Sequence, residues 1–225
     1  MIELLRRYCP ALSDAQRARM AVYWEMLLDW NERINLTAVT EPAEAAQKHF
    51  ADSLTALPYI PEGARCIDVG TGAGFPGIPL LIVRPDIRMT LLDGLRKRVR
   101  FLEAVCEELG IKADCVHARA EDAGRDKAHR ERYDVALARA VAPLPTLLEL
   151  TTPFVIRGGL SICYKGDAAE ELRRAENALT ALRCTARVET VEAAWGRRAL
   201  VMVQKQGSTP SLYPRHAGLP EKKPL

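Results

Sequence analysis

Long hydrophobic runs and a secretory leader are both missing from this 225-residue sequence. Its longest apolar run, Ile78–Val83, contains Pro79 and is far shorter than the about 20 apolar residues that cross a bilayer. Near the amino terminus, Arg6 and Arg7 follow only a few apolar residues, without the hydrophobic segment of a signal peptide. These absences predict a soluble cytoplasmic protein with no membrane partner.

Metal-binding patterns are also missing. The six cysteines include no Cys-x-x-Cys pair, and no histidine cluster accompanies them. Structural zinc sites need such closely spaced ligands, so we expect no metal site. Cys66, Cys115 and Cys163 lie in apolar, strand-like segments, where cysteine packs as a small hydrophobic residue.

A strong excess of charge is lacking too, because the net charge is only +3. Basic residues nevertheless gather in short clusters at 96–100, 173–174, 197–198 and 215–223. Such clusters can neutralise the phosphates of a nucleic acid, but solvated helix faces carry them as well. Charge alone therefore leaves a nucleic-acid partner open.

What the sequence does contain is enough apolar material for one substantial core, since 48% of its residues are hydrophobic. Ser13 and Gln16 form a capping-box pattern ahead of apolar residues at helical spacing between Met20 and Leu28. Pro42–Ala56 predicts another helix. We expect residues 1–60 to form a helical extension beside the main domain.

From Ala64 onward, short apolar segments alternate with helical patterns. This alternation favours an α/β fold with a doubly wound, mostly parallel seven-stranded sheet. The clearest helices are Leu95–Leu109, ended by Gly110, and Ala168–Leu182. We expect the domain to cover 61–206, with 207–225 as an extended basic tail on or near it. The expected strands are Arg65–Val69, Met89–Leu92, Asp114–His117, Tyr133–Leu137 and Leu160–Tyr164, then an antiparallel hairpin of Ala186–Val191 and Ala199–Gln204 joined by Glu192–Arg198.

The segment Cys66–Gly77 runs from the first strand into a helix and contains four glycines. Glycine lets the backbone turn sharply and approach a ligand closely, and a structural turn alone would not need four. Gly72, Gly74 and Gly77 match the dinucleotide pattern Gly-x-Gly-x-x-Gly, so an NAD-linked oxidoreductase is one hypothesis.

Asp68 and Gly70 favour a different cofactor. A carboxylate two residues before the turn would oppose a bound pyrophosphate, whereas it suits the ammonium and sulfonium of S-adenosylmethionine. Gly70 also shifts the glycines out of the dinucleotide register. These residues therefore predict a methyltransferase that uses S-adenosylmethionine.

Later strand ends supply further candidates for the same crevice. Asp93 can accept the ribose hydroxyls of either cofactor, or can simply cap the following helix. The loop Ala118–Asp122 can face an adenine. Arg139 follows the fourth strand and either points into the crevice or lies at the surface.

Several methylation chemistries lack their usual residues. The segment Arg139–Pro143 is not the Asn/Asp-Pro-Pro-aromatic loop of amine methylation, and no cysteine nucleophile lies between Cys115 and Cys163. A ring nitrogen with a free lone pair, such as guanine N7, needs only alignment with the methyl group. We therefore expect no catalytic acid, base or nucleophile, with Arg139 as the one candidate for a positioning role.

Taken together, the motifs resemble the bacterial small-subunit ribosomal RNA guanine-N7 methyltransferase family, also called glucose-inhibited division protein B. One departure is Gly94, where the family more usually has serine; it could loosen the turn beside the ribose. The resemblance covers nearly the whole chain from about Met20. The segments that carry it are Asp68–Pro79, Asn35–Val39, Lys48–Leu54, Arg96–Arg98, His117–Asp122 and the tail from Tyr213 to Leu225.

The resemblance implies methyl transfer from S-adenosylmethionine to N7 of one guanosine in the decoding-region loop of 16S ribosomal RNA, as naked RNA or in the small subunit. A monomer is expected, and a non-catalytic ribosome-assembly factor is the remaining alternative. The family's cofactor residues correspond to Gly70, Phe75, Ala120, Glu121 and Arg139, to which the chemistry above adds Asp68, Gly72 and Asp93. The candidates for RNA contact are Lys48, His49, Arg96, Lys97, Arg119, Lys165 and Arg197.

Overall fold

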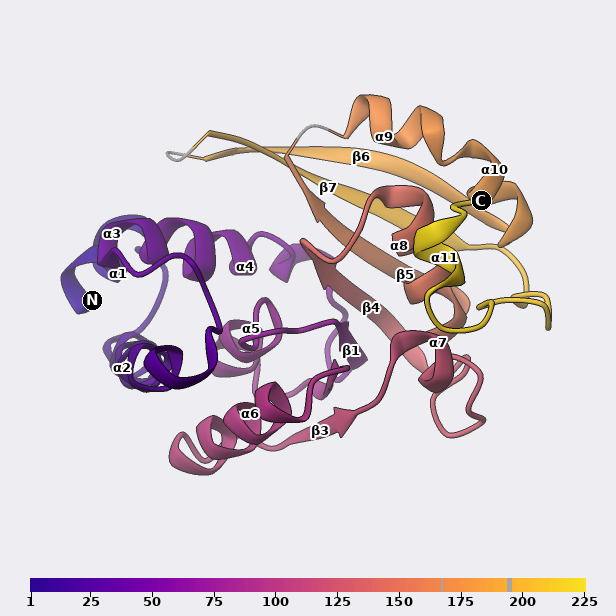
Figure 1. Cartoon of the computed structure of the whole chain (residues 1–225). Helices are drawn as coiled ribbons and strands as arrows, with labels where there is room; N and C mark the ends of the chain where they lie inside the picture. Colours follow the sequence, from indigo (N-terminus) through magenta and orange to yellow (C-terminus); the bar gives the residue numbers. More distant parts are fainter. Residues whose placement is uncertain (167, 194–195) are drawn as a thin grey trace.

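A single seven-stranded sheet runs through the molecule (Figure 1). The computed structural model describes residues 1–166, 168–193 and 196–225. The strand order is β3-β2-β1-β4-β5-β7-β6, parallel except for β7, which is antiparallel to both β5 and β6. The strands are β1 (Arg65–Val69), β2 (Arg88–Asp93), β3 (Ala113–His117), β4 (Tyr133–Arg139), β5 (Val155–Lys165), β6 (Cys184–Ala193) and β7 (Gly196–Lys205).

Helices cover both faces of this sheet, which confirms the predicted doubly wound α/β fold. The central strand β1 is buried on both faces after Arg65, as its apolar sequence requires. The long helix α2 packs with α5 and α6 on one face, and α7, α8 and α10 cover the other. The connecting helices are α5 (Gly77–Val83), α6 (Arg96–Glu108), α7 (Ala120–Ala123), α8 (Leu144–Thr151), α9 (Ala169–Arg174) and α10 (Glu176–Ala181), with a 3-10 turn at Thr152–Phe154.

The amino-terminal helices begin with α1 (Ile2–Tyr8) and α2 (Asp14–Ile34). The predicted capping box is present: Gln16 N donates to Ser13 Oγ at 3.2 Å, and Ser13 N donates to Gln16 Oε1 at 2.8 Å. Tyr23 of α2 is fully buried against the main domain. None of the helices in the described ranges is long and apolar enough to span a membrane.

Two predicted helices are interrupted. Pro42–Ala56 was expected to be one helix, but α3 (Pro42–Ala45) leads into a π-helix (Ala46–Ala51) and then α4 (Asp52–Leu54), with a 3-10 turn at Leu57–Tyr59. The π-helix closes with a bond from Asp52 N to Gln47 O, five residues back. Ala168–Leu182 divides into α9 and α10 because Ala175 N bonds to Leu172 O, three residues back.

The terminal hairpin is confirmed but is longer than predicted. Its register continues from Cys184 opposite Lys205 to Ala193 opposite Gly196, so much of the expected connection Glu192–Arg198 is strand. Residues 194 and 195 of that connection lie outside the described residues.

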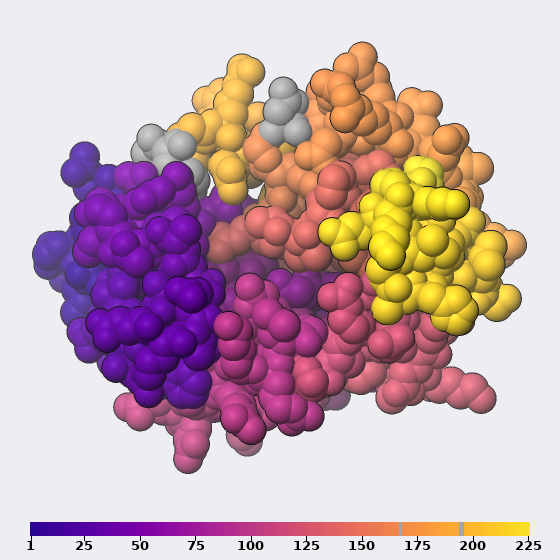
Figure 2. Space-filling view, in the orientation of Figure 1, coloured from indigo at the N-terminus to yellow at the C-terminus, as the bar shows by residue number. Residues whose placement is uncertain are grey.

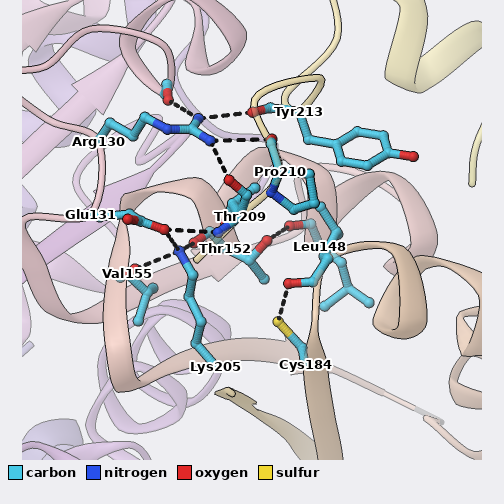
Figure 3. A network of polar contacts seen from close by, with 12 residues as sticks. Arg130, Glu131, Leu148, Thr152, Val155, Cys184, Lys205, Thr209, Pro210 and Tyr213 are labelled. Atoms are coloured by element: carbon cyan, nitrogen blue, oxygen red, sulfur yellow. Dashed lines mark hydrogen bonds and ion pairs between the residues drawn. The ribbon is translucent and has the colours of Figure 1, made fainter. Parts of the chain in front are cut away.

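The tail 207–225 has more structure than an extended segment. It contains α11 (Leu219–Lys222), and Arg130 donates to the carbonyl oxygens of Thr209 and Tyr213, each at 2.8 Å (Figure 3). The fully buried Lys205 pairs with Glu131 at 2.7 Å in the same network. In Figure 2 the tail forms a continuous yellow patch on the surface of the domain.

Candidate cofactor and RNA site

The glycine loop after β1 depends on conformations that glycine favours. Gly70, Gly72 and Gly74 all have positive φ angles of +68°, +62° and +97°. Gly70 also lies so close to Val141 that a Cβ would be 2.8 Å from Val141 Cγ2. The amide nitrogens of Gly70 and Thr71 both donate to Leu92 O, which ties the loop to β2.

Asp68 lies beneath this loop and is completely buried. Its Oδ2 accepts hydrogen bonds from Thr71 Oγ1 at 2.6 Å and from Gly77 N at 2.9 Å. Its Oδ1 is buried without a hydrogen-bond partner in the described part of the chain. Burial raises the pKa of Asp68 to about 6, against the opposing effect of these hydrogen bonds. One oxygen therefore fixes the loop, and the other is a buried acceptor with no partner among the described residues.

Asp93, at the end of β2, is also buried and holds the loop from the other side. Its Oδ2 accepts from Gly72 N at 3.0 Å and from Arg98 Nη1 at 3.4 Å, while Oδ1 accepts from Leu95 N at 2.8 Å. A carboxylate has about four acceptor positions, so capacity for a ribose hydroxyl remains. The alternative that Asp93 caps the following helix is correct in part, because Asp93 accepts a hydrogen bond from the backbone of Leu95, the N-cap residue of α6.

Glu121 of α7 lines a pocket at the carboxyl end of the parallel strands. The residues that line it with Glu121 include Gly70, Asp93, Ala120 and Val141. Glu121 Oε1 accepts from Gly218 N at 2.8 Å and from Arg119 Nη2 at 3.4 Å. Burial alone would raise the pKa of Glu121, but these hydrogen bonds and the charge of Arg119 outweigh it and lower the pKa. The tail thus holds the side chain of a pocket residue in place through Gly218.

Phe75, in the glycine loop, packs against two polar side chains. The ring of His49 stacks on Phe75 with centroids 4.5 Å apart, and the guanidinium of Arg139 lies 5.2 Å from the Phe75 centroid. Burial, and secondarily the charge of Arg139, lower the pKa of His49 to about 4. His49 is therefore neutral near pH 7 and is bonded to Thr37 Oγ1 at 2.9 Å.

Two contributing residues were missed by the sequence analysis. Tyr23 donates a hydrogen bond to Ala73 O in the glycine loop, although its apolar spacing indicated only core packing. Asp52 accepts from both Arg139 and Arg198, and its position within the Lys48–Leu54 motif was its only signal. Both contacts join the amino-terminal helices to the main domain.

The expected RNA-contacting residues differ in their availability. Lys165 is largely buried: its ammonium donates to Ala142 O at 2.8 Å and pairs with Glu171 at 2.6 Å. It holds the loop after β4, and its contact with RNA stays a prediction. A Cβ at Gly94 would lie 3.2 Å from Arg119 Cδ, so glycine gives Arg119 room. The exposed candidates are Lys48, Arg96, Lys97, Arg119 and Arg197.

Sequence comparison identifies relatives over almost the whole chain. A family model described as rRNA small subunit methyltransferase G matches residues 16–201. A protein named ribosomal RNA small subunit methyltransferase G from Alkaliphilus metalliredigens is 46% identical over 221 residues, covering 95% of this chain and 92% of that protein. One of the same name from Brevibacillus brevis is 42% identical over 231 residues, covering 99% and 97%.

Structural comparison gives the fold. A methyltransferase from Pyrococcus furiosus matches with a TM-score of 0.57 at 14% identity, covering 84% of this chain and 98% of that one. An O-methyltransferase from Bacillus cereus, solved in complex with SAH, matches with a TM-score of 0.56 at 17% identity, covering 81% and 90%. The fold is that of the class I methyltransferases, and the antiparallel β7 distinguishes it from the six-stranded dinucleotide-binding sheet.

Proposed function

The chain belongs to the rRNA small subunit methyltransferase G family, and we propose that it transfers a methyl group from S-adenosylmethionine to N7 of one guanosine in 16S ribosomal RNA. Neither the NAD-linked alternative nor a non-catalytic assembly role is supported by these relatives. We further propose that it acts in the cytoplasm as a monomer.

The observation that best supports the cofactor assignment is the buried, unpaired Oδ1 of Asp68. An anionic oxygen in this position favours a cationic ligand and opposes a pyrophosphate. S-adenosylmethionine supplies an electrophilic methyl group on a sulfonium. The proposed cofactor-binding residues are Asp68, Gly70, Gly72, Phe75, Asp93, Ala120, Glu121 and Arg139.

Guanine N7 fits a site that works by positioning. The N7 lone pair forms the new N–C bond as the S–C bond breaks, and no proton has to leave the nitrogen. The protein therefore needs to align donor and acceptor, a contribution that can be large without any general base. The carboxyl edge of the sheet offers a rigid frame for this, with Arg139 at the end of β4 and the glycine loop at the end of β1.

The decisive test is methyl transfer from labelled S-adenosylmethionine. Naked 16S RNA and small subunits, both prepared from a strain that lacks the enzyme, serve as substrates, and the product is located by nuclease mapping and mass spectrometry. We expect one N7-methylguanosine in 16S RNA. Label at another base atom would contradict the proposed position, and subunit binding without label would support an assembly factor instead.

A further inference from the structure

Asp52 joins two arginines that come from distant parts of the chain. Its Oδ2 lies 3.2 Å from Arg139 Nη1 and 3.0 Å from Arg198 Nη2, and its Oδ1 lies 2.7 Å from Arg198 Nε. The Asp52 side chain is only 1% exposed. Charge-assisted hydrogen bonds to a group that is so well shielded from water are strong and directional.

The backbone around Asp52 is also held by hydrogen bonds from two side chains of the sheet. Tyr164 of β5 donates from its hydroxyl to Ser53 O at 2.8 Å. Arg139 Nη1 also donates to Lys48 O at 2.7 Å, in the π-helix that precedes Asp52. The Asp52 carboxylate therefore projects from a backbone that is held in place, and it pairs with Arg139 at the edge of the sheet where the cofactor loop lies.

Arg139 needs this support to keep its place against Phe75. A guanidinium has five N–H donors, and the acceptors that hold Arg139 in the described structure are Lys48 O and Asp52. If Asp52 were replaced by asparagine, Arg139 and Arg198 would both contact a buried, uncharged amide and would have no counter-charge between them. Arg139 would lose its only charged partner in the described structure and would keep Lys48 O as its acceptor, so the guanidinium would be held less firmly against Phe75.

We propose that Asp52 is a positioning residue for the cofactor site, which acts by holding the Arg139 guanidinium against Phe75. The inference rests on the proposed function only for the identity of the cofactor. It assigns the amino-terminal helical segment a role in binding S-adenosylmethionine, although Asp52 itself lies behind Arg139.

The test is a double-mutant cycle read by isothermal titration of S-adenosylmethionine without RNA. Asp52→Asn and Arg139→Gln are each expected to weaken binding about tenfold. The combined variant should be no weaker than Arg139→Gln alone, because Asp52 acts through that side chain. Additive losses in the combined variant would overturn the proposal, as would unchanged affinity in Asp52→Asn.

A matched control separates positioning from general stability. Glu131→Gln neutralises a carboxylate in another ion pair, with the buried Lys205; Glu131 precedes the start of β4, whereas Arg139 lies at the other end of that strand. This substitution should lower the melting temperature without changing cofactor affinity. If Asp52→Asn does not fold, Asp52→Glu replaces it, and its loss must likewise vanish in the Arg139→Gln background. If wild type binds the cofactor but methylates no RNA, the proposed function fails while this cycle still decides the role of Asp52.

Discussion

At the scale of single residues, the protonation state of Asp68 should make the affinity for S-adenosylmethionine depend on pH. Its folded pKa of about 6 means that the carboxylate becomes anionic between pH 5 and 7. We predict that affinity for S-adenosylmethionine rises about tenfold over this interval, because only the anion attracts the cationic ligand. His49 and Glu121 titrate below this window.

The measurement is isothermal titration at several pH values for wild type and Asp68→Asn. The asparagine keeps an oxygen for Thr71 and Gly77, so the loop should persist, but the pH dependence should disappear. A variant that retains the full rise would show that another group is responsible.

His49 gives a second prediction at this scale, concerning stability. Its pKa is about 4 in the folded protein and near 6.5 when unfolded, so the unfolded chain binds more protons between these values. Stability is therefore retained above pH 6.5 and lost as the pH falls toward 4. Compared with His49→Gln, wild type should lose on the order of 1 kcal/mol more unfolding free energy over this interval, measured by urea titration.

At the scale of elements, the tail is fastened to α8 by a buried ion pair. Glu149 is fully buried, and both its oxygens accept from the Arg215 side chain. Arg215→Met should cost about 3 kcal/mol of unfolding free energy, because it leaves an uncompensated buried carboxylate. Urea unfolding measures this loss. Arg174→Met breaks the exposed pair with Glu170 and should change stability by less than about 1 kcal/mol; equal effects would contradict the argument.

At the scale of the whole molecule, the position of a charge on the sheet should matter more than the net charge. Arg96 and Lys97 are exposed at the start of α6, on the edge that holds the cofactor pocket, whereas Arg88 and Lys112 are exposed at the opposite edge. Changing Arg96 and Lys97 to Gln should reduce the slope of log affinity for small-subunit RNA against log salt by about 1 to 2.

The same double change at Arg88 and Lys112 is the control, since it removes an equal charge. It should leave the salt slope nearly unchanged when binding is measured by filter retention across a range of salt. Equal effects of both variants would indicate attraction by net charge rather than an oriented docking surface.

The sequence by itself determined the features that depend on neighbouring residues. Alternating apolar segments and helical patterns indicate the strands and the α/β class, the Ser13–Gln16 pair starts α2, and the glycines after β1 form the loop, because each signal lies within one element and its turn. The π-helix at Ala46–Ala51 was not predicted, since its bonding pattern leaves no simple periodic signal.

Only the tertiary structure decided which charges meet. Asp52 and Arg139 are 87 positions apart, and Glu121 and Gly218 are 97 apart, so no spacing in the sequence brings them together. Lys165 resembles the exposed cations in sequence, yet the fold buries it against Ala142 and Glu171. Local patterns fix the elements and the cofactor loop, whereas ion pairs depend on where packing brings distant side chains within bonding distance.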